Sequence, residues 1–263
     1  MLNSNEGITN LNSSNNTDIS TYPIMGVNIS VTDMATTLSI ITDNLGNWQG
    51  RYICVSNVHT TVMAYEDANY LAIQNNAVMA LPAGGPLSKY CRDHGCKNAG
   101  RVTGPDLMQE ILKLSANYGW RHYFYGSTQD TLDKLKSVIN EKYKGAIICG
   151  MMSPPFRPLT VEEDEQIIKD INEANPDFIW VGLGAPKQEI WMAAHENKVS
   201  GLMIGVGAAF DYESGNIKRA PKWMQKLNLE WLYRLKQDPK RLLPRYIKTN
   251  SKFLIWKYKD GRK

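Results

Sequence analysis

The sequence predicts an α/β fold in which helices cover both faces of a mostly parallel sheet. Three observations support this prediction. Short apolar segments alternate along the chain with longer segments whose apolar residues recur at helical spacing. The apolar segments are continuous rather than alternating, which is typical of strands buried on both faces. Several of them end in glycine-containing loops, and in such sheets ligands bind beyond the carboxyl ends of the strands.

The first half of the chain begins with an Asn-, Ser- and Thr-rich leader, residues 1–22, which we expect to be disordered because it can bury little apolar surface. Thr32 or Asp33 is the expected N-cap of the first helix, and Gly46 lies just past its end. Short apolar runs mark the strands. The predicted elements are a strand over 24–31, a helix over about 33–44, a strand over 52–55, a helix over about 60–75, a strand over 78–81 and a loop over 82–86.

The second half repeats this alternation. Pro105 suits the first turn of a helix, and Leu132 and Leu135 share one face of another. Thr160 and Glu163 show the pattern of a capping box. The predicted elements are a helix over 105–118, a strand over 122–125, a helix around 132–139, a strand over 146–149, a helix from 160, a strand over 178–181, a helix over 186–197 and a strand over 202–204. Together they predict a Rossmann-like domain over 23–217 and a helical appendage over 218–263.

The appendage differs in charge from the rest of the chain. The appendage holds fifteen Lys and Arg against three acidic residues, and the whole chain holds 30 basic and 26 acidic residues. The body of the chain, residues 1–217, therefore has fifteen basic and twenty-three acidic residues. This split predicts that the appendage contacts an anionic partner. Basic amphipathic helices with Trp and Tyr are typical of membrane interfaces. A terminal helix that packs on the domain with a solvated charged face is the alternative. The aromatic residues of the appendage are Trp223, Trp231, Tyr233, Tyr246, Phe253, Trp256 and Tyr258.

Other kinds of site have little support. The four cysteines form no CxxC pair and the four histidines show no HxxxH spacing, so we expect no protein-bound metal, no cofactor and no disulfide framework. No apolar run reaches the roughly 20 residues that span a bilayer, and no signal peptide begins the chain. The acidic body argues against nucleic-acid binding. A homo-oligomer is compatible with the sequence.

The strongest local feature is the segment from Val181 to Glu189, in which a strand ends in glycines and a helix starts near Pro186. Glycines let a ligand approach the backbone, and a helix N-terminus offers free N–H groups, so a diphosphate or uridine fits there. A tight turn before an ordinary capped helix is the alternative. Similar glycine turns follow two other strands. The candidate nucleotide-binding residues are Gly126, Gly182, Gly184, Pro186, Lys187, Gln188, Glu189, Gly207 and Asp211.

Two further polar segments lie where strands give way to helices. Asn57 and Thr60 follow a strand and are expected at the same edge of the sheet, although plain capping of the next helix is the alternative. Arg101 precedes a helix, where an arginine can hold a phosphate or carboxylate in a bidentate manner. Asp106 in the same segment is also explained as a first-turn acid that interacts favourably with the helix dipole.

Taken together, these segments resemble the WecG/TagA/CpsF glycosyltransferases. The resemblance extends in order from about residue 24 to the end of the chain, and the segments that carry it are 55–61, 101–106, 184–189, 205–207 and 219–223. It implies an inverting, metal-independent enzyme that transfers a sugar from a UDP-sugar to a polyprenyl-diphosphate-linked sugar. The products are precursors of teichoic acid, capsule, exopolysaccharide or common antigen. Such an enzyme is a peripheral protein on the inner, cytoplasmic face of the plasma membrane.

The resemblance also assigns roles to residues of this chain. Asn57, Thr60 and Arg101 line the pocket between donor and acceptor. Gln188 and the glycine turns hold the nucleotide. The basic appendage closes over the site and contacts the membrane. The candidates for binding the lipid diphosphate are Arg234, Arg241 and Arg245.

One position departs from the family pattern. The family has an acidic residue, taken as the general base, in the loop that here reads Pro82-Ala83-Gly84-Gly85-Pro86. Alanine accepts no proton, and loss of a general base typically costs roughly 10²–10⁴-fold in rate. Either another residue is the base, or the chain is an inactive homologue that binds UDP-sugars as a sensor or scaffold, or the aspartate was replaced deliberately, which the intact motifs favour. The fallback bases are Asp106, Glu189, Asp211 and His59.

Overall fold

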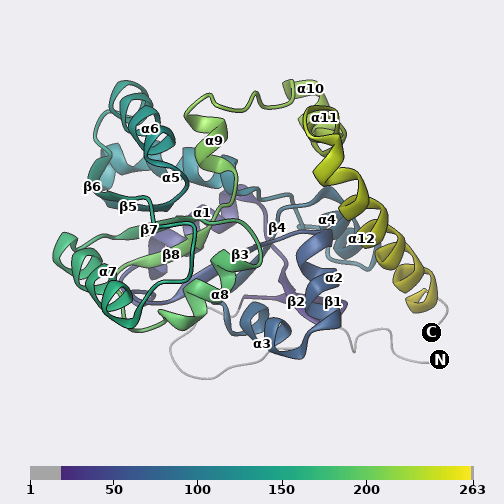
Figure 1. Cartoon of the computed structure of the whole chain (residues 1–263). Coiled ribbons are helices and arrows are strands. Elements are labelled where there is room, and N and C mark those ends of the chain that lie inside the picture. The colour runs from purple at the N-terminus through teal and green to yellow at the C-terminus, as the bar shows by residue number, and fades with distance from the viewer. Residues whose placement is uncertain (1–18, 262–263) are drawn as a thin grey trace.

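Within the described part of the chain, the central sheet consists of six parallel strands (Figure 1). A computed structural model describes residues 19–261, so residues 1–18 of the predicted leader, and residues 262–263, lie outside the described part. The strand order is β4-β3-β8-β7-β5-β6, and every pairing in the sheet is parallel, which confirms the predicted sheet. The strands are β3 (Tyr52–Ser56), β4 (Met79–Pro82), β5 (Arg121–Gly126), β6 (Ile147–Met152), β7 (Phe178–Gly182) and β8 (Leu202–Gly205).

Helices cover both faces of this sheet, as predicted. Successive side chains of a strand point to opposite faces, so Trp180 of β7 packs into one layer and Ile179 into the other. The helices on the first face are α1 (Met34–Asn44), α5 (Gly104–Tyr118), α6 (Gln129–Lys142) and α9 (Ala209–Glu213). Those on the second are α3 (Ala68–Asn76), α7 (Val161–Ala174) and α8 (Lys187–Ala194).

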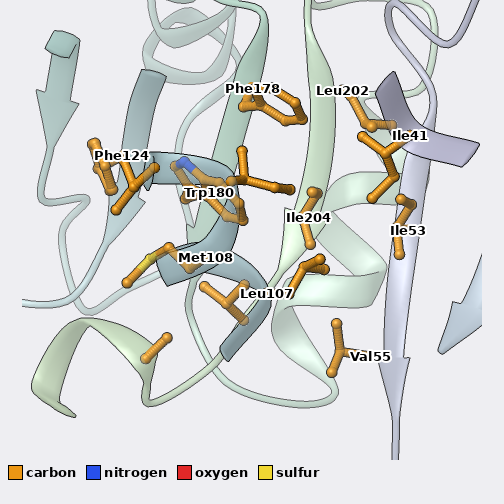
Figure 2. Close-up of a cluster of buried hydrophobic side chains, with 14 of the residues drawn as sticks. Ile41, Ile53, Val55, Leu107, Met108, Phe124, Phe178, Trp180, Leu202 and Ile204 are labelled. Carbon is orange, nitrogen blue, oxygen red and sulfur yellow. The ribbon is translucent and has the colours of Figure 1, made fainter. Parts of the chain in front are cut away.

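The larger hydrophobic core lies between the first face and α5 (Figure 2). Trp180 and Ile204, from adjacent strands, are fully buried in the same cluster as Leu107 and Met108 of α5. Burial of side chains of this size stabilises the fold by about 1.5–3 kcal/mol each. The core therefore fixes α5 on the sheet, and with it the loop that enters α5 at the edge of the sheet.

The segment predicted as one strand over 24–31 is a β-hairpin. β1 (Thr21–Ile24) pairs antiparallel with β2 (Val27–Ser30). The chain reverses at Met25 and Gly26, whose φ angles of 53° and 87° are those of a two-residue hairpin turn. The hairpin begins inside the predicted leader and lies beside β4, where the Ser30 hydroxyl accepts a hydrogen bond from the Ala80 N–H.

Two other predicted segments are divided differently in the structure. The helix predicted over 60–75 is two helices, α2 (Val58–Glu66) and α3, because Asp67 interrupts the first and caps the second with its carboxylate. The loop predicted over 82–86 already contains the start of α4 (Gly85–Asp93), with Pro86 in its first turn. The predicted capping box at Thr160 and Glu163 is confirmed at the start of α7.

The strand predicted as buried over 146–149 is the edge strand β6. Within residues 19–261, β5 is the only strand that pairs with β6, and Ile147 is 42% exposed. The register between β5 and β6 shifts between His122 and Tyr123. Irregular edges of this kind hinder pairing with another chain.

The appendage is helical, as predicted, and α12 runs along the side of the domain formed by α2 and α4 (Figure 1). Leu242 and Phe253 of α12 are buried, and Phe253 packs in a cluster with Tyr90 of α4. A long connection leads from α9 across the top of Figure 1 to the first appendage helix. The appendage helices are α10 (Lys222–Lys226), α11 (Glu230–Gln237) and α12 (Pro239–Asp260).

Candidate active site

The carboxyl ends of the parallel strands bring the predicted site residues to one edge of the sheet. β7 and β8 are neighbours, so the turns that follow them lie side by side. β3 lies next to β8 and is followed directly by Asn57, and β4 lies next to β3 and is followed by Ala83. This edge is where ligands bind in open parallel sheets.

Glycines at the ends of β5 and β7 allow close packing. Gly126 has a φ of +124°, and a Cβ on it would lie 2.7 Å from the carbonyl carbon of Gly182. A Cβ on Gly182 would in turn lie 2.7 Å from the ring of Phe210 in α9. These two predicted nucleotide-binding glycines are thus required by the packing of the sheet edge, whatever else they contact.

The side chain of Gln188 connects the turns after β7 and β8. Its Oε1 accepts hydrogen bonds from the N–H groups of Gly184 (3.1 Å) and Gly207 (3.0 Å). Its Nε2 donates to Glu189 Oε1 (2.8 Å). Gln188 is 4% exposed, so this amide is used inside the protein and sets the spacing of the two turns. Lys187, by contrast, is exposed and offers its charge to the solvent side.

Glu189, in the first turn of α8, is almost completely buried. Burial raises the pKa of its carboxyl and outweighs the opposing hydrogen bond from Gln188. A buried carboxyl without a cationic partner is more stable in its neutral form. Its burial also separates Glu189 from any substrate, which argues against its role as a fallback base.

Asn57 and Thr60 form a capping box at the start of α2. The side-chain oxygen of Asn57 accepts from the N–H groups of His59 (2.9 Å) and Thr60 (3.3 Å). The Thr60 hydroxyl accepts from the Asn57 N–H (2.9 Å), and Thr60 is 1% exposed. Capping therefore accounts for these contacts. Asn57 also lies beside the loop that follows β4, since a Cβ on Gly84 would lie 3.7 Å from the Cβ of Asn57.

Ala83 follows β4 and lies beside the end of β3. Its N–H donates to the Ser56 carbonyl (2.8 Å), and its side chain packs partly against the larger core. Two residues later, a Cβ on Gly85 would lie 2.5 Å from the side chain of Asn228 in the appendage. The absence of a side chain at Gly85 thus lets the appendage approach the loop in which the family places its acidic residue.

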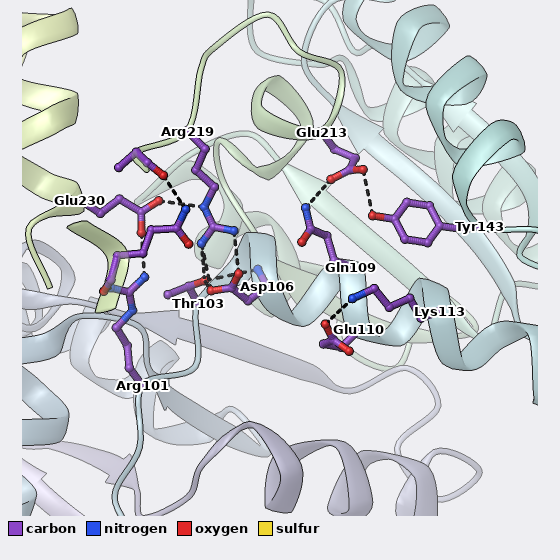
Figure 3. Close-up of polar contacts among 12 residues, drawn as sticks. Arg101, Thr103, Asp106, Gln109, Glu110, Lys113, Tyr143, Glu213, Arg219 and Glu230 are labelled. Carbon is purple, nitrogen blue, oxygen red and sulfur yellow. Dashed lines mark hydrogen bonds and ion pairs between the residues drawn. The ribbon is translucent and has the colours of Figure 1, made fainter. Parts of the chain in front are cut away.

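Two arginines join the loop before α5 to the appendage (Figure 3). Arg219 makes a bidentate ion pair with Asp106 (2.6 and 2.9 Å) and also donates to Glu230 (2.9 Å). Arg101 binds the other oxygen of Glu230 (2.7 Å). The guanidinium of Arg101, which was predicted to hold a phosphate or a carboxylate, binds a carboxylate of the appendage in this structure.

Asp106 is a poor candidate for a general base in this arrangement. Burial alone would raise the pKa of its carboxyl, but hydrogen bonds from Arg219 and Thr103 outweigh it and lower the pKa. Two donors stabilise this carboxylate in its charged form, so it is a weak base.

Asp211, in α9, lies close enough to two of the three arginines predicted to bind a lipid diphosphate for their charges to affect its pKa. Burial raises the pKa of its carboxyl, and Arg234, Asn216 and Arg241 oppose this shift. The guanidinium of Arg234 also lies 5.6 Å from the centre of the Tyr212 ring. Arg234 and Arg241 therefore place positive charge on the α9 side of the site.

The third arginine, Arg245, lies in α12 beside α2. Burial, followed by the nearby charges of Arg245 and Lys248, lowers the pKa of His59 to about 4. His59 is consequently neutral at physiological pH and a weak base. The appendage thus brings cations to the α2 side of the edge as well as to the α9 side.

The sequence did not single out Glu230 or Asn228. Glu230 carries a detectable signal, because it is one of three acidic residues in a strongly basic appendage. Arg219 lies in segment 219–223, which carries part of the family resemblance, but its ion pair with Asp106 could not be predicted because the two residues are 113 positions apart. Asn228 has a φ of +58°, and its sequence neighbours are apolar, so only the fold reveals its contact with Gly85.

Residues 19–261 contain no cluster of three or more His, Cys, Asp or Glu side chains placed to share a metal ion. In the same part of the chain, no helix combines the length and apolarity needed to cross a bilayer. The cysteines Cys54, Cys91, Cys96 and Cys149 are all free.

Comparison with known proteins identifies the family. A model of the glycosyl transferase WecG/TagA/CpsF family matches residues 22–263. The chain is 32% identical over 206 residues to the N-acetylglucosaminyldiphosphoundecaprenol N-acetyl-beta-D-mannosaminyltransferase of Bacillus subtilis (strain 168), which covers 76% of this chain and 78% of that protein. It is 30% identical over 224 residues to the protein of the same name from Staphylococcus aureus (strain MW2), covering 83% and 85%. The chain therefore belongs to the WecG/TagA/CpsF family of glycosyltransferases.

Proposed function

We propose that the chain transfers N-acetylmannosamine from a UDP-sugar donor to a polyprenyl-diphosphate-linked N-acetylglucosamine, with inversion and without a metal ion. The transferred sugar and the acceptor are those in the names of the two relatives. The observation that carries the proposal is the sheet edge itself, where Gln188 holds two glycine turns together between the cationic flanks of the appendage. Both substrates are diphosphates, and both need close backbone approach or cations.

The donor occupies the turns that follow β5, β7 and β8. Gly184 and Gly207 have positive φ and no side chain, so a diphosphate can approach their backbone closely. The N-terminus of α8 presents the positive end of its dipole to the same place. Lys187 is exposed at the start of this helix and adds a full positive charge. These groups stabilise the negative charge that develops on UDP as it leaves.

The acceptor lies between the donor and the appendage. Arg234, Arg241 and Arg245 bind its diphosphate from the two flanks of the edge. Arg241 is paired with Asp238 in an exposed ion pair, which contributes little and is readily exchanged for a diphosphate. This orientation directs the sugar of the acceptor toward the loop that contains Ala83.

The chemistry is a single displacement. The acceptor hydroxyl attacks the anomeric carbon of the donor from the side opposite to UDP, a new C–O bond forms, and the bond to UDP breaks. UDP leaves with the electron pair, and in this chain the hydroxyl proton passes to solvent water. Ala83 cannot take it, so transfer by this chain is slower by roughly 10²–10⁴-fold than with a carboxylate at this position.

The appendage attaches the protein to the inner face of the plasma membrane. The outer side of α12 exposes Leu243, Ile247, Leu254 and Tyr258, whereas Leu242 is buried against the domain. The spacing of the four exposed residues places them within about 60° of one another around the helix. Basic residues lie beside this stripe, and each contributes about 1 kcal/mol near an anionic leaflet. The stripe and the charges together form a surface that suits an anionic membrane.

One observation favours a second function. The alanine at position 83 suits a homologue that binds UDP-sugars without turnover and acts as a sensor or scaffold. In that case the donor site is intact, but restoring an aspartate produces no transfer.

Binding of the donor nucleotide tests both functions at once. We expect UDP at 100 times its Kd to stabilise the protein by about 2.7 kcal/mol, which thermal unfolding detects as a higher Tm. Transfer is then followed with radiolabelled UDP-N-acetylmannosamine and the lipid acceptor in vesicles. A chain whose Tm does not respond to UDP at any concentration contradicts both functions.

A further inference from the structure

A series of buried polar side chains extends from β3 through α3 to the glycine turns. The Ser56 hydroxyl donates to Gln74 Oε1 (2.6 Å), and Gln74 Nε2 donates to the Tyr70 hydroxyl (3.1 Å). Tyr70 lies beside the Glu189 carboxyl, which together with burial raises the pKa of the tyrosine. Glu189 then accepts from Gln188 (2.8 Å). Both ends of this series lie at the edge of the sheet where the site is.

The orientation of the Gln188 amide decides whether the two turns are held. Oε1 must face the N–H groups of Gly184 and Gly207, because a rotated amide would present its NH2 group to two other donors. The amide is packed tightly beneath the end of β8, since a Cβ on Gly205 would lie 3.0 Å from Nε2. Packing alone does not distinguish O from NH2, which are nearly the same size. The N–H groups of Gly184 and Gly207 favour Oε1 on their side, and an acceptor opposite Nε2 strengthens this preference; that acceptor is Glu189 Oε1.

We propose that Glu189 is a positioning residue for the donor site. Its carboxyl oxygen holds the Gln188 amide in the one orientation that ties the turns after β7 and β8 together. Glu189 does not touch the substrate; it sets the distance between two turns whose backbone surrounds the diphosphate. The role in donor binding rests on the proposed function, whereas the tie between the turns belongs to the free protein.

The neutral state of Glu189 is sufficient for this role. No described Lys or Arg forms an ion pair with it, and burial raises the pKa of its carboxyl. A neutral acid or an amide offers the same acceptor oxygen to Gln188 Nε2. Glutamine at this position therefore preserves the acceptor for Nε2, whereas leucine, which has similar volume and no acceptor, removes this restraint and leaves the amide held only by the two glycine N–H groups.

Two variants and a matched control test the proposal. Glu189→Leu removes the acceptor, Glu189→Gln keeps it, and Glu165→Leu makes the same exchange at an exposed site on α7. Calorimetry gives the Kd for UDP, and hydrogen–deuterium exchange resolved to single amides follows Gly184 and Gly207. Loss of a neutral hydrogen bond corresponds to roughly a 3- to 10-fold change in an equilibrium constant. We expect Glu189→Leu to weaken UDP binding and to accelerate exchange at both glycines by that factor, while Glu189→Gln and Glu165→Leu match the wild type.

Three results would overturn the proposal. If the amides of Gly184 and Gly207 exchange at the same rate in Glu189→Leu as in the wild type, the two turns do not depend on Glu189. A Glu189→Gln variant as impaired as Glu189→Leu means that charge, not an oriented acceptor, is what matters. Exchange that rises equally across the whole protein means a general loss of stability. Failure of the wild type to bind UDP would instead contradict the proposed function, because the exchange measurement needs no ligand.

Discussion

Replacement of Glu230 by alanine is expected to undock the start of the appendage. Glu230 accepts one hydrogen bond from Arg101 and one from Arg219, and the three side chains are only 14–17% exposed. Hydrogen bonds to charged groups contribute about 1.5–3 kcal/mol each. Part of this is retained, because Arg219 keeps Asp106 and Arg101 keeps the Gln225 carbonyl. We therefore expect a loss of about 2–3 kcal/mol, which is roughly a 30- to 150-fold change in the docking equilibrium.

Hydrogen–deuterium exchange of residues 219–237 measures this change directly. The amides of α10 and α11 should exchange faster in Glu230→Ala by that factor, while those of the central sheet keep their protection. The control is Glu66→Ala. Glu66 forms an exposed ion pair with Lys252 of the same appendage, and such a pair contributes about 0–1 kcal/mol to stability. Unchanged exchange in Glu230→Ala, or equal opening in both variants, would refute the account of how the appendage is held.

Three further outcomes follow from the same contacts. Ile247→Asp combined with Leu254→Asp should abolish sedimentation with anionic vesicles and leave the Kd for UDP unchanged, since both side chains lie on the exposed stripe of α12. The pKa of Asp106 in the folded protein lies below the ordinary 3.8, so the stability that its carboxylate contributes is present above pH 3.8 and is lost as the pH falls. In urea titrations, the difference in free energy of unfolding between the wild type and Asp106→Asn should therefore shrink from pH 7 to pH 3. Glu189 has a folded pKa above 4.5, so the wild type should lose stability as the pH rises through that raised value, whereas Glu189→Gln should not.

The order of strands and helices was predictable from local patterns. Continuous apolar runs such as Phe178 to Val181 and the capping box at Thr160 each depend on residues close in sequence. The hairpin was missed because Met25-Gly26 is not among the usual hairpin dipeptides, and an unbroken apolar run hides a turn that needs positive φ. The break at Asp67 was missed because a capping aspartate in the middle of a helical pattern is also compatible with a surface position.

The positions of the site residues were more predictable than their contacts. Parallel strands must bring their carboxyl ends to one edge, so the glycine turns and Asn57 were expected together there. The partners of Arg101 and Gln188 could not be predicted in the same way. Arg101 binds a residue 129 positions away, and Gln188 is tied to Gly207 across 19 positions. Such pairings depend on how the appendage and the turns pack, which a single sequence does not encode in its local pattern.

Sugar transfer by Ala83→Asp, compared with the chain as it stands, tests the central claim most directly. Both proteins are given radiolabelled UDP-N-acetylmannosamine and polyprenyl-diphosphate-linked N-acetylglucosamine in anionic vesicles, and their Kd values for UDP are measured in parallel. We expect equal UDP affinity and a transfer rate that is roughly 10²–10⁴-fold higher for the aspartate variant. Equal transfer rates in the two proteins would contradict the account, because position 83 would then not be where the acceptor hydroxyl loses its proton.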